Sequence, residues 1–148
     1  MGGRLTFPGA GYYHASKHAV EALSDALRFE VAGFGVKVSV IEPGLIRTGF
    51  ADTAVGSMDG PDRDDPYAGF EEAVARTTTE NYERGLFSRL GGDPESVAGA
   101  IEEAISARNP RSRYVVTPSA HLFLGLRRLL PDQAWDAALR TSYPQPGR

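Results

Sequence analysis

Only two stretches of this chain predict β-strands, and they lie far apart in the sequence. Residues 36–41 are rich in β-branched side chains, which favour strands. A second, shorter run covers residues 113–117 and ends at Pro118. Helical patterns occupy most of the remaining chain, because apolar residues recur there every three or four positions. The order predicts an α/β protein, yet two strands are fewer than a doubly wound nucleotide-binding sheet needs.

A long helix is predicted directly before the first strand, over residues 10–32. Gly33 and Gly35 follow it, as glycine commonly follows the end of a helix. We expect the apolar side of this helix to pack on the sheet. After the strand, Pro43 stops the ladder because it has no amide hydrogen, and Gly44 allows a tight turn. Open α/β sheets bind their ligands beyond the carboxyl ends of such strands.

Tyr13 and Lys17 lie one helical turn apart near the start of this helix. A spacing of four residues places two side chains on one side of a helix, about 40° apart. We expect the ammonium group to lower the pKa of the phenol, which suits acid–base chemistry at a carbonyl or alcohol. Tyr12 lies on another side and cannot share the lysine. The alternative is that Tyr13 and Lys17 are ordinary neighbours on a helix surface.

The order of these motifs resembles the classical short-chain dehydrogenase/reductase family. In that family a Tyr-x-x-x-Lys helix leads to a strand and then to a Pro-Gly-x-x-x-Thr turn, as in Pro43 to Thr48 here. The resemblance is specific over residues 2–48 and looser over residues 93–118. It implies that Tyr13 is the catalytic acid/base and that Lys17 binds the nicotinamide ribose. It also implies that the Ile46 backbone and Thr48 hold the carboxamide of NAD or NADP. The implied cofactor-binding residues are Tyr13, Lys17, Pro43, Gly44, Ile46 and Thr48.

The resemblance implies an NAD(P)-dependent oxidoreductase that transfers hydride between nicotinamide and a small alcohol or ketone. NAD and NADP are not distinguished by the sequence. Aromatic residues in the middle of the chain suggest an apolar substrate. The family also forms homo-oligomers through the helix that carries Tyr13. Unpaired strand edges would add a tendency to aggregate.

Two parts of the family pattern have no counterpart in this sequence. The dinucleotide fingerprint is a glycine-rich turn after the first strand, whereas Gly9-Ala10-Gly11 follows Phe7-Pro8. The catalytic serine of the family would fall immediately before Met1. We therefore expect the carboxyl-terminal part of a doubly wound Rossmann-like parallel sheet whose first βαβ half is absent. A truncated chain of this kind is expected to be inactive alone. The alternative is a non-catalytic remnant that acts as an interaction module or subunit partner.

The predicted organisation is a single partial Rossmann-like domain over residues 1–148. Residues 49–92 are predicted to form a substrate lid or insert, with a polar, turn-rich part at 56–66 and helical spacing over 67–90. Its aromatic residues either line the substrate region or fill the core. Asp93 and Pro94 predict the start of a helix that runs to residue 107 and turns Ile101 and Ile105 inward. Residues 119–148 are predicted to form a helical tail.

Composition excludes several other classes of protein. The net charge of −3 gives no attraction to nucleic acid, and the arginines at 108, 111 and 113 are interpreted as a solvated turn. There is no cysteine, and the His14–His18 pair has no nearby carboxylate, so no metal site is predicted. No apolar run is long enough to span a membrane. Cytoplasmic localisation is the expectation.

Overall fold

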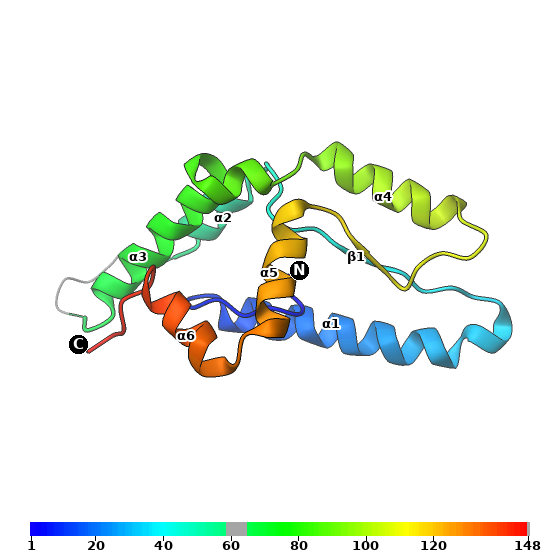
Figure 1. The fold of residues 1–148 in the computed structure, drawn as a ribbon, viewed down its shortest axis with the longest axis horizontal. Helices are drawn as coiled ribbons and strands as arrows, with labels where there is room; N and C mark the ends of the chain where they lie inside the picture. The colour runs from blue at the N-terminus through cyan, green and yellow to red at the C-terminus, as the bar shows by residue number, and fades with distance from the viewer. Residues whose placement is uncertain (59–64, 148) are drawn as a thin grey trace.

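The protein is described from a computed structural model that defines residues 1–58 and 65–147. A small parallel sheet lies between helices (Figure 1). Strand β1 (Val40–Glu42) pairs with β2 (Arg113–Val115) in parallel, with Ile41 opposite Tyr114. The α/β class predicted from the sequence is therefore confirmed. Both strands are shorter than predicted: the ladder begins where the Val40 amide donates to the Ser112 carbonyl.

Helix α1 (Gly11–Glu30) runs alongside the sheet and carries Tyr13 and Lys17 (Figure 1). A short 3-10 turn, η1 (Ala32–Phe34), follows it and ends at Gly35, which has a φ of 75°. Glycine adopts this left-handed conformation without strain. The helix predicted at residues 10–32 is confirmed with slightly shorter ends.

The segment predicted as a lid or insert is helical in its described parts. It contains α2 (Phe50–Gly56), α3 (Ala68–Thr79), a π-helical turn η2 (Glu80–Arg84) and a 3-10 helix η3 (Leu86–Leu90). The predicted turn-rich stretch at 56–66 includes residues 59–64, which lie outside the described residues.

Three further helices complete the described chain. Helix α4 (Pro94–Ser106) precedes β2, and α5 (Pro118–Leu129) and α6 (Asp132–Arg140) form the predicted tail. The Thr117 hydroxyl caps α5 by accepting a bond from the Ala120 amide at 3.2 Å. Asp93 makes no such cap at α4, because its carboxylate instead accepts a bond from Arg47 Nε at 2.7 Å.

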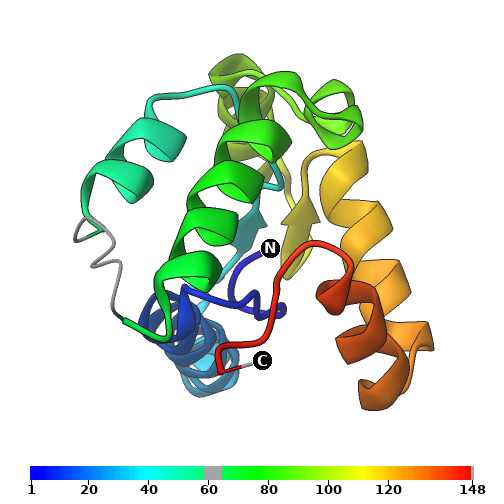
Figure 2. The same ribbon diagram turned by 90° about the vertical axis from the view of Figure 1, so that its left-hand side faces the viewer.

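Aromatic residues join the start of the chain to its tail. The Phe7 ring lies 5.8 Å from the Phe123 ring of α5 and 6.1 Å from the Trp135 ring of α6. Phe87 adds a further contact, with its ring 5.0 Å from Phe123. In Figure 2, α5 and α6 lie on one side of the strands, while α2 and α3 lie on the other. The buried apolar residues are Leu5, Leu45, Ala51, Ala73, Val74, Tyr114, Ala120 and Trp135.

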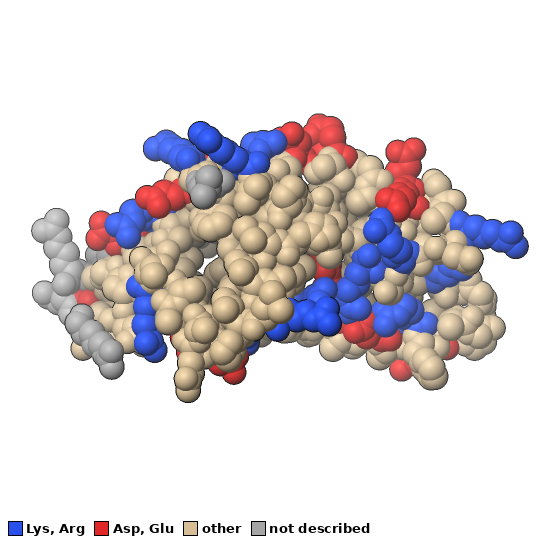
Figure 3. Space-filling view, viewed as in Figure 1, with Lys and Arg blue, Asp and Glu red and all other residues tan. Residues whose placement is uncertain are grey.

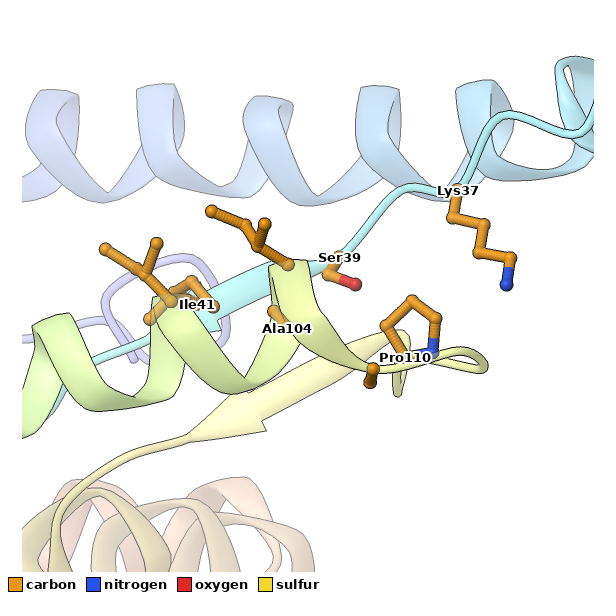
Figure 4. A pocket seen from close by; sticks show the side chains of 8 residues that line it. Lys37, Ser39, Ile41, Ala104 and Pro110 are labelled. Carbon is orange, nitrogen blue, oxygen red and sulfur yellow. The ribbon is translucent and has the colours of Figure 1, made fainter.

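Two helices expose apolar residues that were predicted to face inward. On α1, Val20, Leu23 and Leu27 are exposed. On α4, Ile101 and Ile105 are also exposed, so the prediction that they are inward-facing is wrong. They border a hollow of about 360 Å³ between α4 and residues 37–41 (Figure 4). Apolar surface beside a two-stranded sheet is left uncovered on both of its faces.

Within the described ranges, no helix combines the length and apolar character needed to cross a bilayer.

Candidate functional site

Tyr13 and Lys17 lie on the same side of α1, as their spacing predicts. The Lys17 ammonium stands 5.6 Å from the centre of the Tyr13 ring. Tyr13 is 42% exposed, whereas Tyr12 is 97% exposed and points elsewhere. Of the two adjacent tyrosines, Tyr13 is therefore the one that lies beside Lys17, and its catalytic role stays a prediction.

The pKa of Tyr13 is raised above its usual value, because partial burial disfavours the phenolate. The prediction that Lys17 lowers this pKa is therefore wrong for this chain. The physical reason is packing: the ring lies 5.3 Å from His14 and 5.9 Å from Phe50.

The first two residues connect Tyr13 to the end of β1. The Met1 ammonium donates to the Pro43 carbonyl at 2.7 Å. A Cβ added at Gly2 would lie 3.2 Å from Tyr13 Cε1, so the backbone there runs close against the ring. His14 is buried, and its Nδ1 lies 2.9 Å from the Gly2 carbonyl. Tyr13 and the Pro43–Gly44 turn thus belong to one region of the molecule.

Gly44 is required by close packing at the carboxyl ends of both strands. A Cβ at this position would lie 2.2 Å from Thr117 Oγ1 and 2.5 Å from Ser119 Oγ. The Ser119 hydroxyl also accepts a bond from the Leu45 amide at 3.1 Å. This close packing explains the glycine without a ligand, so its predicted cofactor contact stays a prediction.

Ile46 and Thr48 follow the turn in different settings. Ile46 forms an isolated parallel bridge with Gly92, where the Arg47 amide donates to the Gly92 carbonyl at 2.9 Å. Thr48 Oγ1 accepts a bond from the Phe50 amide at 3.3 Å. The Phe50 ring packs on Tyr13, so Thr48 is joined to the tyrosine through its neighbour two residues on.

Two aromatic residues of this site were not identified from the sequence. The Phe50 ring lies between Tyr13 and Tyr82, with its centre 5.4 Å from that of Tyr82. Burial raises the pKa of Tyr82 to about 12, and the nearby Tyr13 contributes to this shift. Tyr82 lies in the π-helical turn η2, a distortion that is frequent at functional sites. The predicted lid segment therefore supplies one wall of the region around Tyr13, while its Phe87 packs on Phe123 of α5.

A group of charged residues lies farther along α1. Arg113 of β2 reaches Glu21 and Asp25 of α1 and also the buried Glu42 of β1, at distances of 2.8 to 3.1 Å. The interpretation of Arg113 as part of a solvated turn is therefore wrong. Alternation in the second strand could have revealed it, since Tyr114 faces the core and Arg113 faces the opposite side.

The residues around Tyr13 fit one end of a dinucleotide. Tyr13, Lys17 and Thr48 supply a phenol, an ammonium group and a hydroxyl near the end of a parallel strand. Gly9-Ala10-Gly11 does not fit the phosphate end, because it enters α1 without a preceding strand. A Cβ at Gly9 would also collide with Val74 at 2.7 Å. Within the described residues, the fit is therefore to the nicotinamide end alone.

Comparison with known proteins agrees with the order of motifs. A family model described as short chain dehydrogenase matches residues 1–58. The chain is 38% identical over 134 residues to the NADPH-dependent 3-dehydrocapnine reductase of Ornithobacterium rhinotracheale, covering 90% of this chain and 45% of that protein. It is 36% identical over 138 residues to the uncharacterized oxidoreductase YbbO of Escherichia coli K12, covering 93% and 45%. It is 34% identical over 153 residues to retinol dehydrogenase 16 of Rattus norvegicus, covering 99% and 47%.

The chain spans about half the length of the curated relatives that it matches. The similarity extends through almost the whole chain, well beyond the residues of the family model. The Tyr13–Lys17 helix, the strand and the Pro43–Thr48 turn occur in the order of the family. The chain belongs to the short-chain dehydrogenase/reductase family.

Proposed function

We propose that these residues form the substrate and nicotinamide side of an NAD(P)-dependent oxidoreductase acting on an alcohol or ketone. The observation that carries the proposal is the joint position of Tyr13 and Lys17 on α1 beside the end of β1. The family and the name of the NADPH-dependent relative support a nicotinamide cofactor, with the choice between NAD and NADP left open.

In the proposed reaction Tyr13 exchanges a proton with the substrate oxygen. During reduction of a ketone its phenol donates the proton to the oxygen that becomes the alcohol hydroxyl, and during oxidation its phenolate takes that proton back. A bound nicotinamide cofactor supplies or accepts the hydride at carbon. Lys17 would hold the ribose hydroxyls and stabilise the phenolate. Its charge would compete with the burial that raises the pKa of Tyr13 in this chain.

Phe50 and Tyr82 favour an apolar substrate. Both belong to the predicted lid segment at residues 49–92, and their rings form a row beside Tyr13, with centres 5.9 Å and 5.4 Å apart. Aromatic walls with one convergent polar group are typical of sites for small apolar ligands. A substrate of this kind agrees with the name of one relative, retinol dehydrogenase 16.

We further propose that the sheet is part of a larger Rossmann-like sheet. Among the described residues, β1 has a strand partner on one edge only. Exposed apolar residues flank it on α1 and α4, and the hollow below α4 lies against residues 37–41. Additional strands and helices would cover these surfaces. The relatives are about twice as long as the chain and so have the residues to do this. The oligomeric state and a cytoplasmic location stay predictions.

The reading frame upstream of the Met1 codon tests whether these residues belong to a longer catalytic polypeptide. We expect it to remain open and to encode serine directly before Met1. An in-frame stop at that place would contradict the proposal.

Substitution of Tyr13 tests the chemistry in the polypeptide that carries these residues. Tyr13→Phe removes the transferable proton and is expected to lower kcat with an alcohol or ketone substrate at least ~10²-fold. Tyr12→Phe is the matched control, because Tyr12 is almost fully exposed, and it should leave kcat unchanged. Equal rates for Tyr13→Phe and the wild type would remove Tyr13 from the reaction.

One observation favours the alternative of a non-catalytic interaction module. The exposed apolar residues of α1 form a surface suited to a protein partner. Fluorescence titration of the 148-residue chain with NADPH and NADH tests whether this chain holds a complete cofactor site by itself. We expect no micromolar binding by this chain alone, since no phosphate cradle is seen among its described residues. Binding would instead support a complete cofactor site.

A further inference from the structure

The strongest unexplained feature outside the proposed site is the charge network beneath the strands. Arg113 donates to Glu21 from Nε and Nη2 at 3.1 and 3.0 Å, and to both Asp25 oxygens from Nη2 at 2.8 Å. Its Nε also lies 3.1 Å from Glu42, which is 1% exposed. Arg4 binds the second oxygen of Glu42 at 3.1 Å. In Figure 3, blue and red atoms meet along α1 below β2, whereas few charged atoms cover α5.

The two carboxylates of α1 continue the line of the candidate catalytic pair. Glu21 lies one turn beyond Lys17, and Asp25 one turn beyond Glu21. Residues spaced by four drift only about 40° around a helix at each step. Counted from Lys17 the drift is therefore about 40° at Glu21 and about 80° at Asp25, and counted from Tyr13 it is about 80° and about 120°. Bonds to these two carboxylates thus act next to the side of α1 that carries Tyr13 and Lys17, and they constrain the rotation of the same helix.

Apolar packing does not fix the rotation of α1 about its axis. Val20, Leu23 and Leu27 are all exposed, and the side of α1 toward the strands is polar. Residues 1–4 fix its position instead, since a Cβ at Gly3 would lie 2.6 Å from the Lys17 carbonyl oxygen. Rotation is constrained at two places: at His14 in the first turn, and at Glu21 and Asp25 farther along.

Arginine is suited to this task. Its planar guanidinium group presents several donors in a fixed fork and can bind two carboxylates with a defined direction. A lysine would supply the charge without that geometry. Arg113 is itself held by the strand pairing of β2 and by buried Glu42. Its bonds to α1 therefore fix the rotation of the helix relative to the sheet.

We propose that Arg113 is a positioning residue which, by gripping Glu21 and Asp25, sets the rotation of α1 and thus the direction of Tyr13 and Lys17. For catalysis this inference rests on the proposed function. A helix rotation of 20° moves a side-chain tip about 6 Å from the axis by about 2 Å. A misplacement of ~1 Å can lower turnover ~10²-fold.

The first experiment uses the 148-residue chain and needs no catalysis. Its tyrosine rings are labelled with ¹³C, and the Tyr13 signal is identified by its loss in Tyr13→Phe. Because the Tyr13 ring packs on His14 and Phe50, its chemical shift and its titration midpoint report its orientation. Arg113→Gln is expected to change both, and Arg113→Lys is expected to restore them only in part.

Arg111→Gln is the matched control. Arg111 is two residues away and makes an equally short ion pair, 2.7 Å to Glu103, but its partner lies on α4. This variant should leave the Tyr13 signal at its wild-type position. If Arg113→Gln does not fold, Glu21→Gln makes the same test while the Arg113–Glu42 pair is kept.

The outcomes separate positioning from simple stabilisation. A lowered melting temperature with an unchanged Tyr13 signal in Arg113→Gln and Glu21→Gln would overturn the proposal, because it would show that local contacts with His14 and Phe50 orient the tyrosine without Arg113. A changed signal in both, with Arg111→Gln unaffected, supports it.

The second experiment measures turnover in the polypeptide that carries these residues. Arg113→Gln is expected to lower kcat at least tenfold with little change in KM, and Arg111→Gln should leave kcat unchanged. A shifted Tyr13 signal in a protein that shows no oxidoreductase activity would refute the proposed function and leave the positioning role intact. An unchanged kcat in an active enzyme would refute the positioning role alone.

Discussion

Helices α1 and α4 cover opposite faces of the same two strands, but they are held there by different forces. Arg113 binds α1 through carboxylates, and buried Glu42 completes the network. Against α4 the strand presents Ile41, and the contact leaves a hollow of about 360 Å³ (Figure 4). One helix is oriented by a few directional bonds and the other by incomplete apolar packing.

The difference bears on where a site can be built. Apolar contact is not directional, so a loosely packed helix such as α4 can shift without losing a particular bond. Charge-assisted hydrogen bonds specify an angle as well as a distance. The helix that carries Tyr13 and Lys17 is the one held by directional bonds, which is the arrangement that a site requiring fixed geometry needs.

The largest effect on stability is expected on the α1 side. Arg113→Gln leaves the buried Glu42 with Arg4 as its remaining ion-pair partner. Breaking a buried ion pair in this way should lower the free energy of unfolding by about 3 kcal/mol, as measured by urea denaturation.

Arg111→Gln is again the comparison, because its pair with Glu103 is exposed on both sides. Its loss should cost less than about 1 kcal/mol. Equal losses for the two variants would mean that burial of Glu42 adds nothing to the strength of the network.

The sequence predicted the helices and the motif order better than it predicted the surfaces they use. Helical spacing and glycine placement located α1, α4 and the tail helices, because these signals are local. The prediction that the apolar side of α1 packs on the sheet was wrong, because the side toward the strands is polar and the apolar side is exposed. The spacing of residues within one helix cannot reveal that its carboxylates will pair with an arginine some ninety residues farther along the chain.

The same limit applies within the candidate site. Tyr13, Lys17 and the Pro43–Gly44 turn were found because their spacing has a direct geometric meaning. Phe50 and Tyr82 were missed as site residues, since their proximity to Tyr13 depends on how distant helices pack. The predicted lowering of the Tyr13 pKa was wrong for a related reason: neighbours from distant parts of the chain bury the ring, and this burial raises the pKa.

A smaller, opposite effect is expected on the α4 side. Ala104 lines the hollow, and Ala104→Leu would fill part of it with apolar atoms next to Ile41 and Ile101. We expect stabilisation by about 0.5–1 kcal/mol in urea denaturation. Ala98→Leu is the control, because Ala98 is exposed on the same helix, and it should change stability by less than about 0.5 kcal/mol. Destabilisation by Ala104→Leu would indicate that α4 cannot accommodate the added volume.

The smallest expected effect is a pH dependence of stability, which should be present on the α1 side of the strands and absent on the α4 side. Hydrogen bonds from Arg113 and then Arg28 lower the pKa of Asp25 to about 2, from an ordinary value of 3.8. A lowered pKa means that the unfolded chain binds the proton first, so the stabilising contribution is present above about pH 4 and is lost as the pH falls toward 2. The difference in unfolding free energy between wild type and Asp25→Asn should therefore shrink over this interval in urea denaturation, and high salt should reduce it throughout.

The effect of Ala104→Leu is the control for this prediction. It should not change with pH in the same range, since no titrating group is altered. If the difference in unfolding free energy for Asp25→Asn stays constant from pH 5 to 2, the Asp25 carboxylate charge contributes nothing to holding α1. Glu21 would then be the one residue of α1 whose ion pair with Arg113 stabilises the protein.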